Sequence, residues 1–172
     1  ALCILSAINV GAIGNINELE SLCDLSVRAL DEIIEIQDYP VKAAEVSTKS
    51  RRSLGIGYIG LAHYLAKNGV KYSDPKAWEL VDRLSEAFQY YLLRASCDIA
   101  EEKGKCSAFD KTKYADGLLP IDHYKKEVDE IVVHKQRMAW ESLRKDIAKY
   151  GLRHSTLSAQ MPSESSSVVS NE

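Results

Sequence analysis

The chain has 172 residues, of which 45% are hydrophobic and 27% are charged, and its formal net charge is -3. This balance is typical of a folded domain rather than of a disordered segment. Lysine and arginine are interspersed with aspartate and glutamate, so no basic face indicates a nucleic-acid partner. No apolar run approaches the roughly 20 residues that cross a bilayer. We therefore expect neither a nucleic acid nor a membrane as partner.

The four cysteines, Cys3, Cys23, Cys97 and Cys106, show no pattern of a metal site. None belongs to a C-x-x-C pair, and no histidine lies at zinc-ligand spacing from them. Cys23 and Cys97 fall within helical patterns, which predicts that they pack as small apolar side chains. From the residues alone, Cys3 is also interpreted as a core cysteine.

The chain opens with an apolar run at 1–11 that ends in glycine, which predicts a strand buried on both faces. Residues 15–40 predict a helix. Asn17 would cap its start, Glu20 would complete a capping box, and the Tyr-Pro pair at 39–40 would end it.

A polar, basic stretch at 49–53 leads into LGIGYIGLAHYLAKNG. Leu54, Tyr58, Leu61 and Leu65 recur there at helical spacing, so this segment predicts a second helix that ends at Gly69.

The second half of the chain is mostly helical by its pattern. Ser73-Asp74-Pro75 predicts the start of a long helix that stops near Gly104. Residues 106–135 predict a loop or short helix and then a charged helix that begins at Pro120. WESLRKDIAKYG at 140–151 predicts another helix, LRHSTLSAQM a returning strand, and PSESSS a turn out of it. This order favours an α/β barrel or a layered α/β fold.

The sequence gives little indication of a glycine-rich nucleotide loop or of a Ser-His-Asp catalytic site. Gly55, Gly57 and Gly60 fit G-x-G-x-x-G, but no predicted strand precedes them, which favours glycines that permit close helix packing over a nucleotide loop. No G-x-S-x-G elbow supports Ser-His-Asp catalysis. His63, His123 and His134 are therefore interpreted as solvent or packing residues.

A denser pattern lies in WESLRKDIAKYGLRHSTLSAQMP at 140–162. It resembles the signature of the large (alpha) subunit of ribonucleotide reductase: a Trp, a Leu three residues on, Gly-Leu-Arg-His, then Ser-Ala and a Pro. Every fixed element is present, at Trp140, Leu143, Gly151, Leu152, Arg153, His154, Ser158, Ala159 and Pro162. ALCILSAINVG, RRSLGIGYIGLAHYLAKNG, QYYLLRAS and LLPIDHYKK resemble other segments of the same family, so the resemblance covers essentially the whole chain.

The resemblance implies an α/β fold, namely part of the ten-stranded reductase barrel, mostly helical in this stretch. Residues 1–172 would form a partial catalytic barrel domain and no complete independent domain. The family's Asn-x-Cys-x-Glu, which carries the radical cysteine, does not occur in this sequence. The chain also lacks an initial Met, and Glu172 stands where the family usually continues Ala-Thr-Asn-Gly. We therefore expect an internal piece of a longer protein that is inactive alone.

The resemblance also assigns site residues. In the family, a Pro-Ser-Glu-Ser-Ser loop before a helix holds the substrate diphosphate, which corresponds here to Glu164, Ser165 and Ser166, with Ser163 beside them. Exposed N–H groups and the helix dipole suit that role. Cys3 corresponds to the later member of the redox cysteine pair, whose partner lies outside this chain.

The implied function is the reduction of ribonucleoside diphosphates by a class I enzyme in the cytoplasm. The resemblance implies a small (beta) subunit with a radical-generating metal centre, a homodimer of large subunits, ATP and dNTP effectors, and a thioredoxin- or glutaredoxin-type reductant. No cofactor is expected on this segment itself. Two alternatives stay open: a non-catalytic helical interaction module derived from the fold, and a nucleotide-binding enzyme that uses LGIGYIG.

Overall fold

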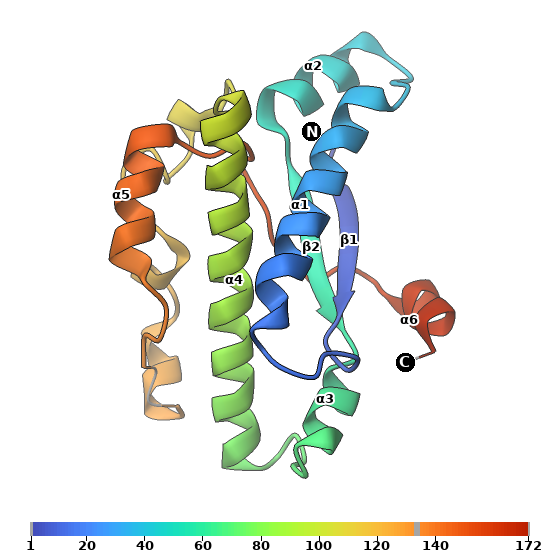
Figure 1. Cartoon of the computed structure of the whole chain (residues 1–172), viewed down its shortest axis with the longest axis vertical. Coiled ribbons are helices and arrows are strands. Elements are labelled where there is room, and N and C mark those ends of the chain that lie inside the picture. The colour runs from blue at the N-terminus through green and yellow to red at the C-terminus, as the bar shows by residue number, and fades with distance from the viewer. Residues whose placement is uncertain (1, 133–134, 172) are drawn as a thin grey trace.

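The computed structural model describes residues 2–132 and 135–171. Long helices run side by side along the molecule, and a small parallel sheet lies behind α1 (Figure 1). The elements are β1 (Ile4–Asn9), α1 (Glu18–Ile36), α2 (Lys42–Arg51), β2 (Leu54–Ile59), α3 (Leu61–Lys67), α4 (Pro75–Lys103), α5 (Trp140–Tyr150) and α6 (Glu164–Ser170), with 3-10 turns at Phe109–Lys111, Pro120–Asp122 and Lys126–Glu130.

The sheet consists of β1 and β2, which pair in parallel from Ile4 opposite Leu54 to Asn9 opposite Ile59. The connection between the two strands contains α1 and α2, as a parallel pair requires a crossover. Within the described residues the sheet is open and β1 forms its edge. The fold is therefore α/β, as predicted, and its sheet is small and parallel.

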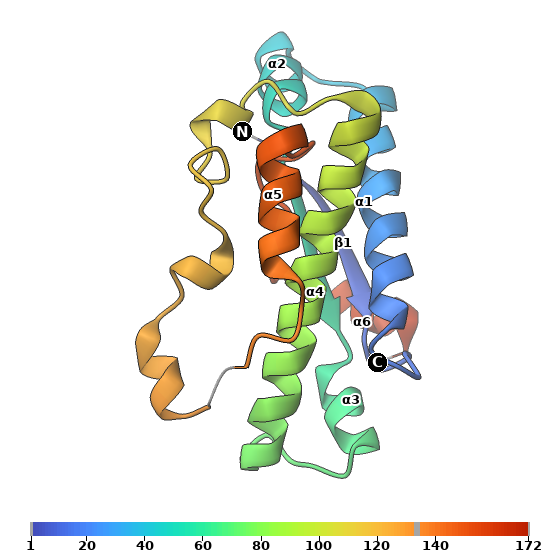
Figure 2. The same ribbon diagram turned by 60° about the vertical axis from the view of Figure 1, so that its left-hand side comes forward.

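The core lies between the sheet and the two longest helices. α1 packs on both strands and on α4, and α5 packs on the opposite side of α4 (Figure 2). Leu84, Phe88, Leu92 and Ile99 of α4 are buried, because a helix covered on two sides needs a broad apolar surface. In the described part of the chain, no helix is both long and apolar enough to cross a membrane.

Three of the predicted elements are confirmed, and the two helices among them also have the predicted boundaries. β1 lies within the apolar run at 1–11, α4 begins at Pro75 and ends before Gly104, and α5 ends before Gly151. Both glycines have positive φ, at 87° and 76°, a conformation that a residue with a Cβ adopts only with strain.

The helix predicted from residue 54 is wrong in its first half, because residues 54–59 form β2 and only 61–67 are helical. The segment alternates large apolar residues with glycines, a pattern of period two, and it is almost entirely buried beside β1. The helix predicted from Pro120 is also wrong. Its described residues form 3-10 turns at Pro120–Asp122 and Lys126–Glu130 in place of a helix.

The predicted capping box of α1 is absent, since Asn17 makes no side-chain cap hydrogen bond. The Glu18 carboxylate instead accepts hydrogen bonds from the N–H groups of Gly14 and Asn15, at 3.1 and 2.8 Å. β1 is not buried on both faces either. Leu5 is 50% exposed, because no further layer of the described chain covers that side.

Candidate functional site

A third chain segment runs parallel to β2 and leads to the predicted phosphate loop. The N–H groups of Leu54 and Ile56 donate to the carbonyls of Thr156 and Leu157, at 3.0 and 2.8 Å, and Ala159 N–H donates back to Ile56 at 3.1 Å. In a regular parallel pair, amides two residues apart bind carbonyls that are also two residues apart. Here the two carbonyls are consecutive, so β2 has one more residue than the opposite segment at this point, as in a bulge. The strand predicted at 152–161 is therefore reduced to a single bridge between Ile56 and Ser158.

The glycines of β2 allow this segment to lie against the strand. A Cβ on Gly57 would lie 2.4 Å from the carbonyl oxygen of Ala159 and 2.8 Å from Oε1 of Gln160. No side chain fits at those distances. The close contact is with an extended segment and not with a helix, which corrects the predicted helix packing. It also disfavours the nucleotide-loop alternative, because Gly55 and Gly57 lie inside a buried strand.

Beyond this segment the chain enters α6, with Ser163 at the N-cap. The first hydrogen bond of the helix joins Ser167 N–H to the Ser163 carbonyl at 2.8 Å. The N–H groups of Glu164, Ser165 and Ser166 belong to the first turn and have no partner of this kind. All three side chains are exposed. The residues predicted to hold phosphate thus lie together at the start of a helix, with donors available to an anion.

Cys3 lies elsewhere. It directly precedes β1 and is exposed, so the prediction that it lies in a buried strand is wrong for the described chain. Ile4, Leu54 and Thr156 lie level with one another in the sheet. Cys3 is therefore at the N-terminal end of the parallel segments, whereas residues 164–166 follow their C-terminal end. The structure does not bring the two predicted parts of the site together.

The other three cysteines are buried, as predicted for Cys23 and Cys97. Burial raises the pKa of Cys23 to about 12 and that of Cys97 to about 11, and it also raises the pKa of Cys106. A thiol with so high a pKa is a poor nucleophile because it stays protonated. Of the four cysteines, only Cys3 is accessible for thiol chemistry.

Sequence reasoning missed a buried network of charges next to the phosphate-loop segment. Asp31 of α1 accepts hydrogen bonds from Arg52 Nε at 2.7 Å and from Arg153 Nε at 3.3 Å, and its carboxylate lies 3.1 Å from His154 Nε2. His154 Nδ1 lies 2.9 Å from the Ser96 hydroxyl of α4. These contacts join α1, α4 and the start of β2 to residues 153–154. The only signal in the sequence was the clustering of Arg and His in the 151–154 motif.

The protonation of the network follows from its contacts. Burial lowers the pKa of His154, although the Asp31 carboxylate opposes this shift. Burial alone would raise the pKa of Asp31, but hydrogen bonds from His154 and Arg52 outweigh it and hold that pKa well below its usual range. We therefore assign a charged Asp31 and a neutral His154 that donates from Nε2 and accepts from Ser96 at Nδ1.

Comparison with known proteins gives a consistent result. The profile of the family described as "Ribonucleotide reductase, barrel domain" matches residues 1–172. The chain is 58% identical over 171 residues to the ribonucleoside-diphosphate reductase subunit alpha of Buchnera aphidicola subsp. Schizaphis graminum, covering 99% of this chain and 22% of that protein. The subunit alpha of Haemophilus influenzae is 58% identical over 171 residues, covering 99% and 23%.

The ribonucleoside-diphosphate reductase 1 subunit alpha of Escherichia coli is 54% identical over 138 residues, covering 80% of this chain and 18% of that protein. The chain thus spans about a fifth of the length of the curated relatives it matches.

Proposed function

Because this chain belongs to the ribonucleotide reductase barrel-domain family, we propose that it is a segment of an alpha subunit that reduces ribonucleoside diphosphates to deoxyribonucleoside diphosphates. The observation that carries the proposal is the family match over all 172 residues, together with a Ser-rich first helical turn at the position of the family's phosphate loop. The activity belongs to the whole subunit, of which this segment supplies two parts.

The first part is the substrate-phosphate loop. The free N–H groups of Glu164, Ser165 and Ser166 and the positive end of the α6 dipole would bind the diphosphate, and the two serine hydroxyls would add directional donors. The Glu164 carboxylate repels an anion, but it is exposed and can turn to solvent while its backbone N–H donates. The loop therefore binds and orients the substrate without taking part in bond breaking.

The second part is the reductant, Cys3. With a partner cysteine from the rest of the subunit, it would supply two electrons: the 2′-carbon exchanges its hydroxyl for hydrogen, the hydroxyl leaves as water, and the two thiols become one disulfide. The partner must come within roughly 4.4–6.8 Å, Cα to Cα. The reaction proceeds through a thiyl radical, for which a cysteine outside this chain is required. An external dithiol, of the thioredoxin or glutaredoxin type, would reduce the disulfide.

The uncovered side of β1 supports a larger sheet. Leu2 and Leu5 are 49% and 50% exposed, and β1 pairs only with β2 in the described chain. An open strand edge beside exposed leucines is unfavourable in water. We therefore propose that further strands of the subunit cover this edge, complete a ten-stranded barrel, and bring the partner cysteine to Cys3.

The rest of the machinery is proposed from the family. It comprises the small (beta) subunit with its radical-generating metal centre, the homodimer of alpha subunits, and nucleotide effectors bound outside this segment, in a cytoplasmic enzyme.

The test is the substitution Cys3→Ser in the full-length subunit assayed with its small subunit. We expect turnover driven by an external dithiol to fall about a hundredfold or more, because serine cannot form the disulfide, while substrate KM changes little. Cys23→Ser is a poor control because Cys23 is buried, so Ser107→Ala, at an exposed hydroxyl outside the site, is the matched control. Full turnover in Cys3→Ser would contradict the proposed role of Cys3 and favour a non-catalytic role for this segment within the subunit.

A further inference from the structure

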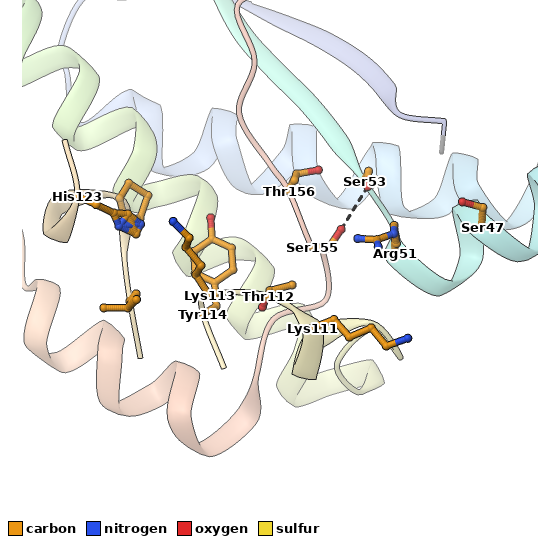
Figure 3. Close-up of a pocket in the computed structure, with 12 residues that line it drawn as sticks. Ser47, Arg51, Ser53, Lys111, Thr112, Lys113, Tyr114, His123, Ser155 and Thr156 are labelled. Atoms are coloured by element: carbon orange, nitrogen blue, oxygen red, sulfur yellow. Dashed lines mark hydrogen bonds between the residues drawn. The ribbon is translucent and has the colours of Figure 1, made fainter. Parts of the chain in front are cut away.

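A cleft of about 700 Å³, shown in Figure 3, lies at the N-terminal end of β2, the end of the sheet that is away from α6. Its size is within the range of small-molecule sites. It contains neither Cys3 nor the residues predicted to bind substrate phosphate. The side chains that line it come from α2, the start of β2, the 111–123 region and the segment after His154: Ser47, Arg51, Ser53, Lys111, Thr112, Lys113, Tyr114, Leu118, Pro120, His123, Ser155 and Thr156.

The ionisable side chains that line the cleft include basic groups but no carboxylate. Arg51, Lys111, Lys113 and His123 line it, and none of the twelve lining residues is acidic, although the whole chain has a net charge of -3. A general excess of positive charge therefore does not explain the cluster. Figure 3 shows Arg51 toward one end of the cleft and Lys113 and the His123 imidazole toward the other, so the basic side chains are not gathered at one end.

Two of these basic side chains are also unpaired within the described part of the chain. Arg28, Arg94 and Arg144 each bind two carboxylates, so arginine in this fold is usually neutralised. In contrast, Arg51 and Lys113 make no ion pair with any residue in the described ranges. Like charges held around one cleft without counter-ions repel one another, and a bound anion relieves that repulsion.

The cleft also offers neutral donors on a fixed framework. Ser53 and Ser155 are buried, and their hydroxyl oxygens lie 3.2 Å apart. The Ser155 N–H donates to the Arg51 carbonyl at 2.9 Å, which holds the end of α2 against the segment after His154. The neighbouring Arg52 is anchored on Asp31. The cationic end of α2 is thus attached to a rigid part of the fold.

We propose that this cleft binds a small diphosphate-bearing anion, with Arg51 as the bidentate ligand and Lys111, Lys113 and the hydroxyls as further donors. Guanidinium and ammonium groups with several hydroxyls are the usual partners of phosphate oxygens. This site is distinct from the loop at 164–166, because the two lie at opposite ends of the parallel segments. The inference does not depend on the proposed reductase activity.

The experiment uses the full-length subunit and inorganic pyrophosphate as probe. Lysine reactivity toward an amine-modifying reagent is followed by mass spectrometry while pyrophosphate is titrated. We expect protection of Lys111 and Lys113 but not of Lys145, an exposed lysine of α5 outside the cleft. Raising the salt concentration should weaken the protection, because the contacts are ionic.

Arg51→Ala should raise the pyrophosphate concentration for half-protection about tenfold, the loss of one charge-assisted contact. Lys145→Gln is the matched control and should leave it unchanged. Both side chains are exposed, so thermal midpoints should stay near wild type and show that Arg51→Ala still folds. Ser165→Ala should also have no effect on this protection, which separates the cleft from the substrate loop.

An ADP titration distinguishes the two sources of a diphosphate. Equal protection by ADP and pyrophosphate assigns the cleft to free diphosphate, and stronger protection by ADP assigns it to a nucleotide; both support a diphosphate site. Absence of protection in the full-length subunit, or protection that Arg51→Ala leaves unchanged, would overturn the proposal. The first of these results would mean that other parts of the subunit fill the cleft.

Discussion

The carboxylate of Asp31 and the imidazole of His154 lie 3.1 Å apart although 123 positions separate them in the sequence. Both side chains are almost completely buried, with exposed fractions of 1% and 0%. Asp31 also binds Arg52, which precedes β2 and has a left-handed backbone with φ 48°. Such a conformation is costly for a residue other than glycine, so it needs firm side-chain anchoring. The network holds α1, β2 and the phosphate-loop segment in one arrangement.

Asp31→Asn should therefore loosen the attachment of residues 153–155. The substitution leaves Arg52 buried without its main counter-ion, and breaking a buried pair costs about 3–5 kcal/mol. The amides of Arg153 and Ser155, which donate to the carbonyls of Ser96 and Arg51, should exchange hydrogen much faster in the full-length subunit.

The matched control for Asp31→Asn is Glu102→Gln. Glu102 pairs with Arg28 at the surface, where such a pair contributes about 1 kcal/mol or less. Unchanged exchange at residues 153–155 in Asp31→Asn would show that the network does not anchor this segment.

Acid should weaken the same attachment through His154. Its pKa is lowered in the folded protein, so the unfolded chain takes up a proton as the pH falls below about 6.5 while the folded protein stays neutral. The contribution of His154 to the stability of the attachment is thus fully present above that pH and is lost on acidification. Asp31, whose folded pKa is also lowered, adds a further loss at lower pH.

The measurement is the opening free energy of residues 153–155, from hydrogen exchange corrected for the intrinsic rate, between pH 7 and pH 5. His154→Gln keeps an amide donor toward Asp31 but cannot titrate. We expect the slope of the opening free energy against pH to fall by up to about 1.4 kcal/mol per pH unit in this variant, which is the value for one proton. An unchanged slope would show that His154 is not the titrating group.

Gly57→Ala should displace the segment that leads to the phosphate loop. The new Cβ would lie 2.4 Å from the Ala159 carbonyl, a backbone atom that moves only with its segment. We expect the KM for the diphosphate substrate to rise about tenfold, which corresponds to about 1.4 kcal/mol, with a smaller change in kcat.

Gly55→Ala in the same strand is the control for Gly57→Ala. Its Cβ would meet mainly Leu5 Cδ2, at 2.6 Å, the end of a half-exposed side chain that can change rotamer. Equal effects of the two substitutions on KM would contradict the specific role of Gly57.

The sequence predicts the elements with strong local signals and misses those that depend on distant contacts. Pro75 and Gly104 delimit α4 because proline favours a helix start and Gly104 adopts positive φ. Residues 54–59 matched a helical spacing by coincidence, and only the pairing with β1 and with residues 156–159 makes them a strand. The Pro120 segment has a helix-start residue and apolar residues at helical spacing, but Val128 and Ile131 stay exposed and the described residues form 3-10 turns.

The candidate site was predictable only as far as its motif is local. Residues 163–166 could be placed at a helix start, since a helix N-terminus is a feature of a few consecutive residues. The Asp31 network joins residues more than 100 positions apart, and nothing near Asp31 in the sequence distinguishes it from the other acidic residues of α1. The position of Cys3 relative to the loop depends on strands outside this chain.

The phosphate loop should depend on its serine hydroxyls but not on the Glu164 carboxylate. In the full-length subunit, Ser165→Ala and Ser166→Ala should each raise substrate KM about three- to tenfold, since a hydrogen bond contributes about 0.5–1.5 kcal/mol. Glu164→Gln keeps the backbone N–H and removes a negative charge near the phosphate, so KM should stay the same or fall. Ser170→Ala, at the other end of α6, is the control. A large rise of KM in Glu164→Gln would instead make the carboxylate itself a ligand, through a bridging cation or the sugar hydroxyls.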